Sequence, residues 1–224
     1  MAKIFSVEAN GGPTSSVDST GCTLIAAWVR PDGAPGTLFS DSEANTWTAR
    51  TAVSEPSFGI GGRWFYCENP TTDAAHTFTS GYGSLLIVIG FSEVDTSGGA
   101  FDKETTSTTG GGGASSLTVS STTPSQTGSL LLSGISLYSD AGARTDPVLG
   151  GGWTTDEAID WAGSGRLGGG LGHLIQAAPA GVTAPWTWTG GTAYVPGSII
   201  VFKYSGSGGG GSSNGAARHY YAQL

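Results

Sequence analysis

Residues 20–29 read Thr-Gly-Cys-Thr-Leu-Ile-Ala-Ala-Trp-Val, and residues 127–136 read Thr-Gly-Ser-Leu-Leu-Leu-Ser-Gly-Ile-Ser. Each stretch is a Thr-Gly turn followed by a short run of apolar and small residues. Such a run, bounded by turn residues, is typical of a buried β-strand. The same strand signal at two places in the chain indicates an internal duplication.

Four further pairs of segments support the duplication, because they recur in the same order along the chain. They are Trp47-Thr48 with Trp153-Thr154, 61–70 with 170–179, 76–79 with 186–189, and 85–92 with 198–205. Chance similarity in a chain rich in Gly, Ser and Thr is the competing explanation. We interpret the five ordered matches as two repeats, at about 15–95 and about 117–205, joined by a crossover at about 97–116.

The repeats predict an all-β fold. Residues 76–79 and 186–189 alternate strictly between large and small polar side chains, as half-buried strands do, and the runs ending at 92 and 205 suit strands buried on both faces. We predict a two-layer antiparallel β-sandwich of jelly-roll type, spanning residues 1–205 and made of two internally repeated halves. One sandwich with a shared core is favoured over two tandem small ones.

Composition agrees with a folded β protein. Charged residues make up only 12% of the chain and Gly occurs 39 times, so the usual residues of exposed helix faces are scarce. The 7 Trp, 7 Tyr and 8 Phe argue against general disorder.

Charge and hydropathy exclude several partners. The net charge is −8 and the basic residues are scattered singly, so nucleic acid and anionic membrane surfaces are unfavourable partners. The longest apolar run, 85–89, is too short for membrane insertion, and no signal peptide is recognisable. We expect synthesis in the cytoplasm with Cys22 and Cys67 reduced, a disulfide between them being the alternative.

The C-terminal end changes character after residue 205. Residues 206–217 form a Gly/Ser linker. The linker and residues 218–224 together form a flexible C-terminal tail. Residues 218–224 are aromatic and amphiphilic, and we predict that they are a partner-docking peptide whose contacts are made by Arg218, His219, Tyr220, Tyr221 and Leu224. A plain disordered end is the alternative.

Catalytic and metal-binding motifs are missing from the sequence. His76, His173 and His219 are far apart in the chain, and no His-Glu-x-x-His, Cys-x-x-Cys, G-x-S-x-G or phosphate-binding loop occurs. We therefore predict that the protein is not an enzyme and has no cofactor. The acidic groups, among them Asp156, Glu157 and Asp160, fall in predicted loops as solvated charges. Calcium is the one ion that such loops could take, and no particular set can be named.

The tryptophans are candidates for packing and for binding. Trp47 and Trp153 recur in both repeats, which indicates core positions. Trp186 and Trp188 are two residues apart and share a strand face. That face is either buried or, together with Tyr194, an exposed aromatic surface that stacks on glycan rings.

The first repeat resembles a β-sandwich module of tailed-phage virion accessory proteins and related prophage or bacterial surface proteins. The resemblance rests on the Thr-Gly turn, Asp41-x-x-x-Asn45-Thr46-Trp47-Thr48, Arg63-x-x-Tyr66-x-x-Asn69-Pro70 and residues 76–79, and it covers mostly residues 15–95. The second repeat keeps it weakly, at Gly152-Trp153-Thr154.

The resemblance implies a structural, non-enzymatic role in a virion, as a capsid decoration, head fibre or tail component assembled in the host cytoplasm. Other virion proteins and further copies of this chain would be its partners. The alternative function is that of a carbohydrate-binding module that recognises host-surface glycans through exposed aromatic residues.

Overall fold

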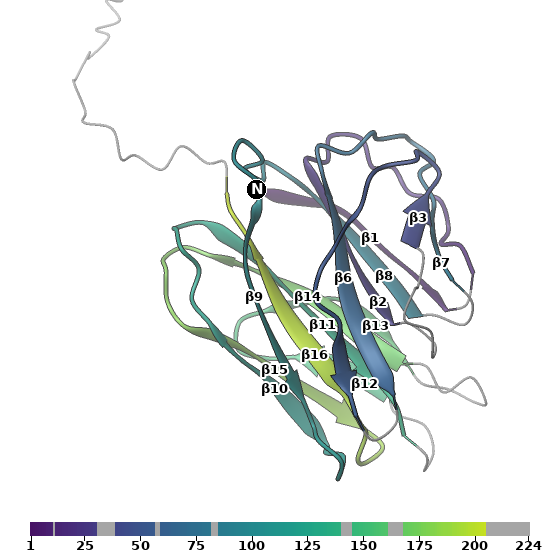
Figure 1. Cartoon of the computed structure of the whole chain (residues 1–224), viewed down its shortest axis with the longest axis vertical. Helices are drawn as coiled ribbons and strands as arrows, with labels where there is room; N and C mark the ends of the chain where they lie inside the picture. Colours follow the sequence, from purple (N-terminus) through teal and green to yellow (C-terminus); the bar gives the residue numbers. More distant parts are fainter. Residues whose placement is uncertain are drawn as a thin grey trace, which may run out of the picture.

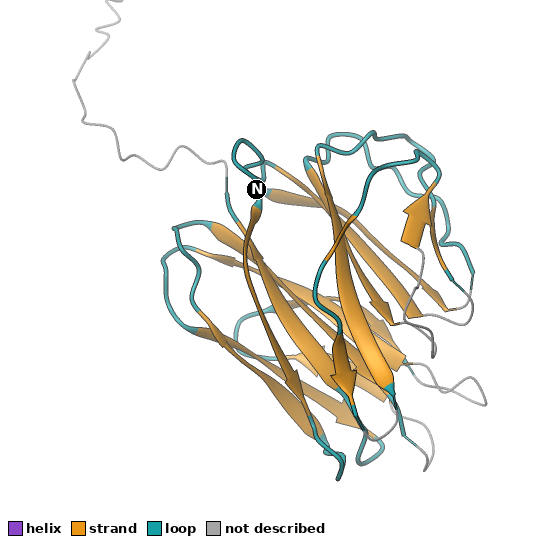
Figure 2. Cartoon of the chain, viewed as in Figure 1, coloured by secondary structure: helices purple, strands orange, loops and turns teal. Residues whose placement is uncertain are grey.

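The computed structural model describes residues 1–10, 12–30, 39–56, 59–81, 85–139, 145–160 and 168–204, and every helix or strand among them is a β-strand (Figure 2). Within these residues, no helix long and apolar enough to cross a membrane occurs. The tail predicted at 206–224 lies outside the described residues. We call residues 1–92 the first half, 93–100 the connection and 101–204 the second half.

The first half consists of a large and a small antiparallel sheet. The large sheet has the order β1-β8-β2-β6-β4, with β5 also pairing with β6, and the small sheet pairs β3 with β7. The strands are β1 (Ala2–Asn10), β2 (Leu24–Arg30), β3 (Phe39–Asp41), β4 (Thr48–Ala49), β5 (Val53–Glu55), β6 (Ile60–Glu68), β7 (Phe78–Ser80) and β8 (Leu85–Ser92).

The second half repeats this plan. Its large sheet has the order β13-β14-β11-β16-β9, and its small sheet has the order β10-β15-β12. The strands are β9 (Phe101–Thr108), β10 (Ser116–Thr122), β11 (Ser129–Leu137), β12 (Thr145–Leu149), β13 (Thr154–Ile159), β14 (Gly168–Gln176), β15 (Val182–Thr189) and β16 (Pro196–Phe202).

The two halves share one topology. In each large sheet the first strand pairs with the last, the last with β2 or β11, and that strand with β6 or β14. In the small sheet of the first half, the segment from Pro13 to Val17 takes the place of β10. Pro13 and Val17 form isolated bridges with Thr79 and His76, in and beside β7. This strand order, with the chain passing back and forth between two sheets, is that of a jelly roll. The predicted all-β antiparallel fold in two repeated halves is confirmed. The single two-layer sandwich favoured from the sequence is corrected: each half has two sheets and a core of its own, and a further core joins the halves.

Three hydrophobic cores hold the molecule together. One lies between the sheets of the first half, and one lies between the sheets of the second half. A third, which we call the shared core, is built from the outer faces of both large sheets. Figure 1 shows the resulting layers, from β10 and β15 on the left to β3 and β7 on the right.

Burial on both faces explains the sequence of the central strands. Every residue of β2, β11 and β16 is buried, and β8 is buried up to its last residue. Alternate side chains of each strand point to a sandwich core and to the shared core. Such strands need apolar or small residues at every position.

Trp28 is, with Trp64, one of the two tryptophans of the shared core. It is fully buried, it lies over Gly134 of β11, and its Nε1 donates a hydrogen bond to Ser136 Oγ at 3.1 Å. A Cβ at Gly134 would come within 2.6 Å of the indole. The glycine is therefore what allows the two large sheets to approach at this point.

The repeated tryptophans lie in corresponding connections. Trp47 lies between β3 and β4 and packs against the core of the first half, and Trp153 lies between β12 and β13 in the core of the second half. Trp153 Nε1 donates a hydrogen bond to the Thr183 carbonyl at 3.0 Å.

The structure adds strands where the sequence did not predict them. Residues 2–10 form β1, and the predicted crossover at 97–116 contains β9. Both are the first strands of their jelly rolls and lie at the edge of a large sheet. An edge strand keeps polar side chains, as in Phe-Asp-Lys-Glu-Thr-Thr-Ser-Thr of β9, so its hydrophobic pattern is weak.

Candidate functional site

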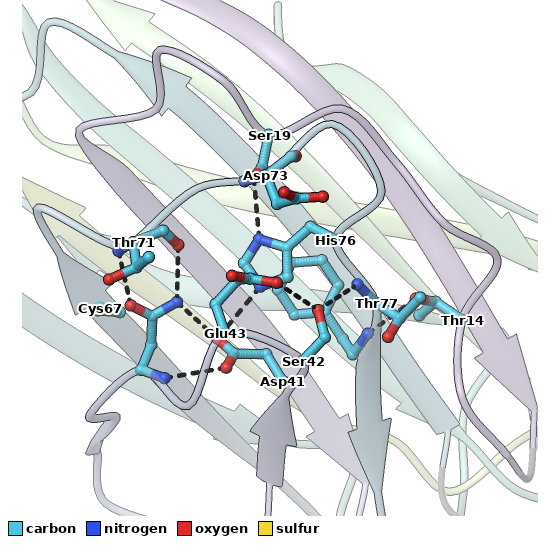
Figure 3. Close-up of polar contacts among 12 residues, drawn as sticks. Thr14, Ser19, Asp41, Ser42, Glu43, Cys67, Thr71, Asp73, His76 and Thr77 are labelled. Atoms are coloured by element: carbon cyan, nitrogen blue, oxygen red, sulfur yellow. Dashed lines mark hydrogen bonds and ion pairs between the residues drawn. The ribbon is translucent and has the colours of Figure 1, made fainter.

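A buried polar cluster lies at one end of the first jelly roll, where three loops meet (Figure 3). At its centre His76 stands between Ser19 and Asp41. Its Nδ1 lies 2.9 Å from Ser19 Oγ, and its Nε2 lies 3.3 Å from Asp41 Oδ2. The imidazole also stacks on Phe78, with ring centroids 4.3 Å apart. The side chains of His76 and Asp41 are completely buried, and so is Ser19.

The cluster continues from Asp41 to a third loop through Asn45. Asp41 accepts hydrogen bonds from the Asn45 backbone N–H at 3.0 Å and from Asn45 Nδ2 at 2.8 Å. The Asn45 amide in turn bonds both backbone groups of Thr71, at 3.0 Å to the carbonyl and 2.7 Å from the N–H. Asp41 and Asn45 therefore connect one loop to the next.

Ser, His and Asp are the side chains of the nucleophile, base and acid of acyl-transfer enzymes. Here their arrangement differs in two ways. Nδ1 rather than Nε2 faces the serine. The contact from Nε2 to Asp41 is close, but its geometry is not that of a hydrogen bond, so the acid does not orient the ring as in a triad.

The hydroxyl of Ser19 is also fully engaged. Its Oγ accepts the Asp73 N–H at 3.0 Å and lies 3.1 Å from the Asp73 carbonyl, to which it can donate. A nucleophile needs an open side where a substrate carbonyl can approach, and Ser19 has no exposed surface. The arrangement is chemically suited to joining loops.

Ala44 marks a strained point beside this cluster. Its φ is +54°, in the left-handed region that favours glycine. The conformation brings the Asn45 N–H onto the carboxylate of Asp41.

The sequence did not reveal this cluster. It treated His76 only as one of three histidines far apart in the chain, and it left Ser19 without a role. Asp41 and Asn45 were visible as a motif, but their partners lie elsewhere in the chain: His76 is 35 residues from Asp41 (76 − 41), and Thr71 is 26 residues from Asn45. Only the jelly-roll connection of those loops brings the groups together.

The second half has apolar aromatic residues in the corresponding strand. Trp186 is fully buried and donates a hydrogen bond to Ser133 Oγ at 2.9 Å, and Trp188 is 6% exposed and donates to the Gly191 carbonyl at 3.0 Å. The core alternative is therefore right for both, and the exposed glycan platform on these rings is wrong. Tyr194 is half-buried, with its ring 6.5 Å from that of Tyr138.

A second polar group lies where β1 of the first half meets β13 and β14 of the second. Asp156 binds His173 Nδ1 through Oδ2 at 2.6 Å and Lys3 Nζ through Oδ1 at 2.7 Å. His173 also packs edge-on against Phe91, at 5.4 Å between ring centroids. The group ties the two halves together.

Acidic side chains gather on the same edge. Partial desolvation raises the pKa of Glu8, whose side chain remains exposed, and so do the negative charges of Glu157 and Asp160. The prediction of solvated loop charges is wrong for Asp156 and Glu157, which lie in β13, and the Asp156 side chain is completely buried. Among the residues that the structure describes, no three His, Cys, Asp or Glu side chains are placed to hold a metal ion. Calcium binding stays a prediction.

Cys22 and Cys67 are free and buried in the first half. Burial raises the pKa of Cys22 to about 12 and that of Cys67 to about 11, with a smaller contribution from neighbouring carboxylates. Thiols of this kind are poor nucleophiles and poor metal ligands at neutral pH.

The predicted docking residues Arg218, His219, Tyr220, Tyr221 and Leu224 lie outside the described residues. Comparison with protein-family models, curated proteins and solved structures finds no match to this chain. The function therefore has to be inferred from the chemistry of the described residues.

Proposed function

We propose that this protein is a non-enzymatic structural component of a tailed-phage virion, such as a capsid decoration, head fibre or tail component. One observation carries the proposal. The buried cluster of Ser19, His76 and Asp41, the best candidate for chemistry in the described chain, has no exposed serine and is used to join loops. The residues of the virion-module motif thus act in the architecture of the first jelly roll.

The rest of the described molecule is compatible with this role. Its strands enclose three cores, so it offers a rigid body that presents loops at the ends of two sandwiches. Its net charge of −8 disfavours contact with packaged nucleic acid and favours exposure on the outside of a particle. We propose that other virion proteins are its partners and that residues 218–224 provide the anchor.

Mass spectrometry of purified particles tests the proposal. Tailed particles from the source culture are banded in a density gradient, and peptides of this chain are quantified against those of the major capsid protein. We expect a fixed ratio across the particle band, and immunogold labelling of one structure on the particle. A peptide signal that does not follow the band would exclude a virion role.

The glycan-binding alternative has no observation in its favour among the described residues. It depended on an exposed aromatic surface, and Trp186 and Trp188 are buried.

A further inference from the structure

The two halves meet at two edges that the duplication relates to each other, and each edge carries one ion pair. At the first edge β1 lies against β13, and Lys3 Nζ is 2.7 Å from Asp156 Oδ1. At the second, β9 lies against the segment of β4 and β5, and Arg50 Nε is 3.0 Å from Glu104 Oε2. The Arg50 guanidinium also covers the Phe101 ring at 3.7 Å.

The polarity of the two pairs is the same. The first half supplies the cation in both, Lys3 and Arg50, and the second half supplies the anion, Asp156 and Glu104. Since β1 corresponds to β9, and β4 to β13, two first halves packed in this way would place Lys3 near Arg50. Two second halves would place Glu104 near Asp156.

Burial makes such a mismatch costly. The side chain of Asp156 has no exposed surface, and those of Arg50 and Glu104 are 24% and 17% exposed. A charge that is buried without its partner destabilises an interface far more than a surface charge does. Glu8 acts in the opposite sense at the first edge, because Glu157 and Asp160 lie near it.

The shape of the shared core also favours the pairing of a first half with a second half. Trp28 of β2 fills the space over Gly134 of β11. β2 reads Leu-Ile-Ala-Ala-Trp-Val-Arg and has no glycine at any position. A second first half therefore offers no corresponding space for the indole, and a second half has no tryptophan in β11 to fill it.

We infer that the first half binds only a second half, and that the one partner able to replace its own is the second half of another copy of this chain, by reciprocal exchange. The connection joins the halves between Ser92 and Phe101, and Ser97 and Gly98 within it are exposed. An exchanged dimer repeats every contact of the shared core and both ion pairs. This inference does not depend on the proposed virion role.

Charge reversal in the full chain tests both the exchange and its selectivity. One variant carries Lys3→Glu and Arg50→Glu, and the other carries Glu104→Lys and Asp156→Lys. In either variant alone every edge is mismatched, in the monomer and in the homodimer, whereas in the exchanged mixed dimer all four edges are matched. After mixing in denaturant and refolding, native mass spectrometry should show at least about a ten-fold excess of mixed dimer over each homodimer.

The outcome is decisive even where a variant does not fold by itself, since the mixed dimer must then appear only in the mixture. A random distribution of the three dimers would contradict selection by the ion pairs. Failure of the mixture to give any dimer would contradict it equally, because the mixed dimer restores opposite charges at all its edges.

Discussion

The substitution Gly134→Ala tests the contact between the two large sheets directly. A Cβ at this position would lie 2.6 Å from Trp28 Cδ2 and 2.7 Å from Cγ, well inside van der Waals contact. Trp28 is fully buried, so its ring cannot move into solvent. Inserting a methyl group into a packed core costs about 1–3 kcal/mol, and we expect the free energy of unfolding to fall by that amount.

Trp28→Ala removes the other side of the same contact. It should cost about 3–5 kcal/mol, because it deletes a buried aromatic side chain and leaves a cavity. In this background the methyl group of Gly134→Ala enters the cavity instead of clashing. Its cost should fall to about zero, which gives a coupling energy of about 1–3 kcal/mol between a residue of β2 and a residue of β11.

Urea unfolding followed by circular dichroism measures all four proteins of this cycle, with equal m-values as the condition for comparison. Gly98→Ala is the matched control, since nothing lies within 4 Å of its added Cβ, and its effect should stay within about 0.5 kcal/mol. The same loss of stability for Gly134→Ala with and without Trp28 would refute the packing of the two sheets.

Three further predictions concern single residues. Ser19 should remain unlabelled by a fluorophosphonate probe, and Ser19→Ala should cost about 1–3 kcal/mol in urea unfolding because it leaves buried backbone groups without a partner; labelling of Ser19 in the folded protein would show that it is a reachable nucleophile. The pKa of Glu8 is raised above its ordinary value of 4.5 by burial, Glu157 and Asp160, so its ionised form opposes folding, and the protein gains stability as pH falls through the folded pKa. Glu8→Gln should therefore be more stable than the parent protein at pH 7 and lose this advantage near pH 4.5, whereas a difference independent of pH would rule out the electrostatic cause. Ala44→Gly should raise the free energy of unfolding by about 0.5–1 kcal/mol, because glycine adopts a φ of +54° without strain; a loss of stability in thermal or urea unfolding would show that the strain is not there.

The sequence was informative wherever one physical pattern dominates. The central strands β2, β8, β11 and β16 are apolar along their length because both of their faces are buried. Their recurrence with Trp47 and Trp153 also indicated the two halves. The jelly-roll type followed from many short strands separated by turns.

The sequence was silent where distant polar residues meet. Ser19 and His76 lie in separate loops and Asp41 is the last residue of β3, and each alone reads as an ordinary turn or core residue. The edge strands were also missed, since the charge of Glu104 in β9 is explained only by Arg50 of the other half. Topology decides these contacts, and one sequence shows topology only indirectly.

Cleavage of the connection after folding tests most directly that the two jelly rolls are joined by a shared core. A specific protease site inserted between the exposed residues Ser97 and Gly98 leaves every strand intact once cut. The structure predicts that the two fragments elute together in size-exclusion chromatography and unfold in one transition. Fragments that separate on the column while each remains folded would contradict the shared core.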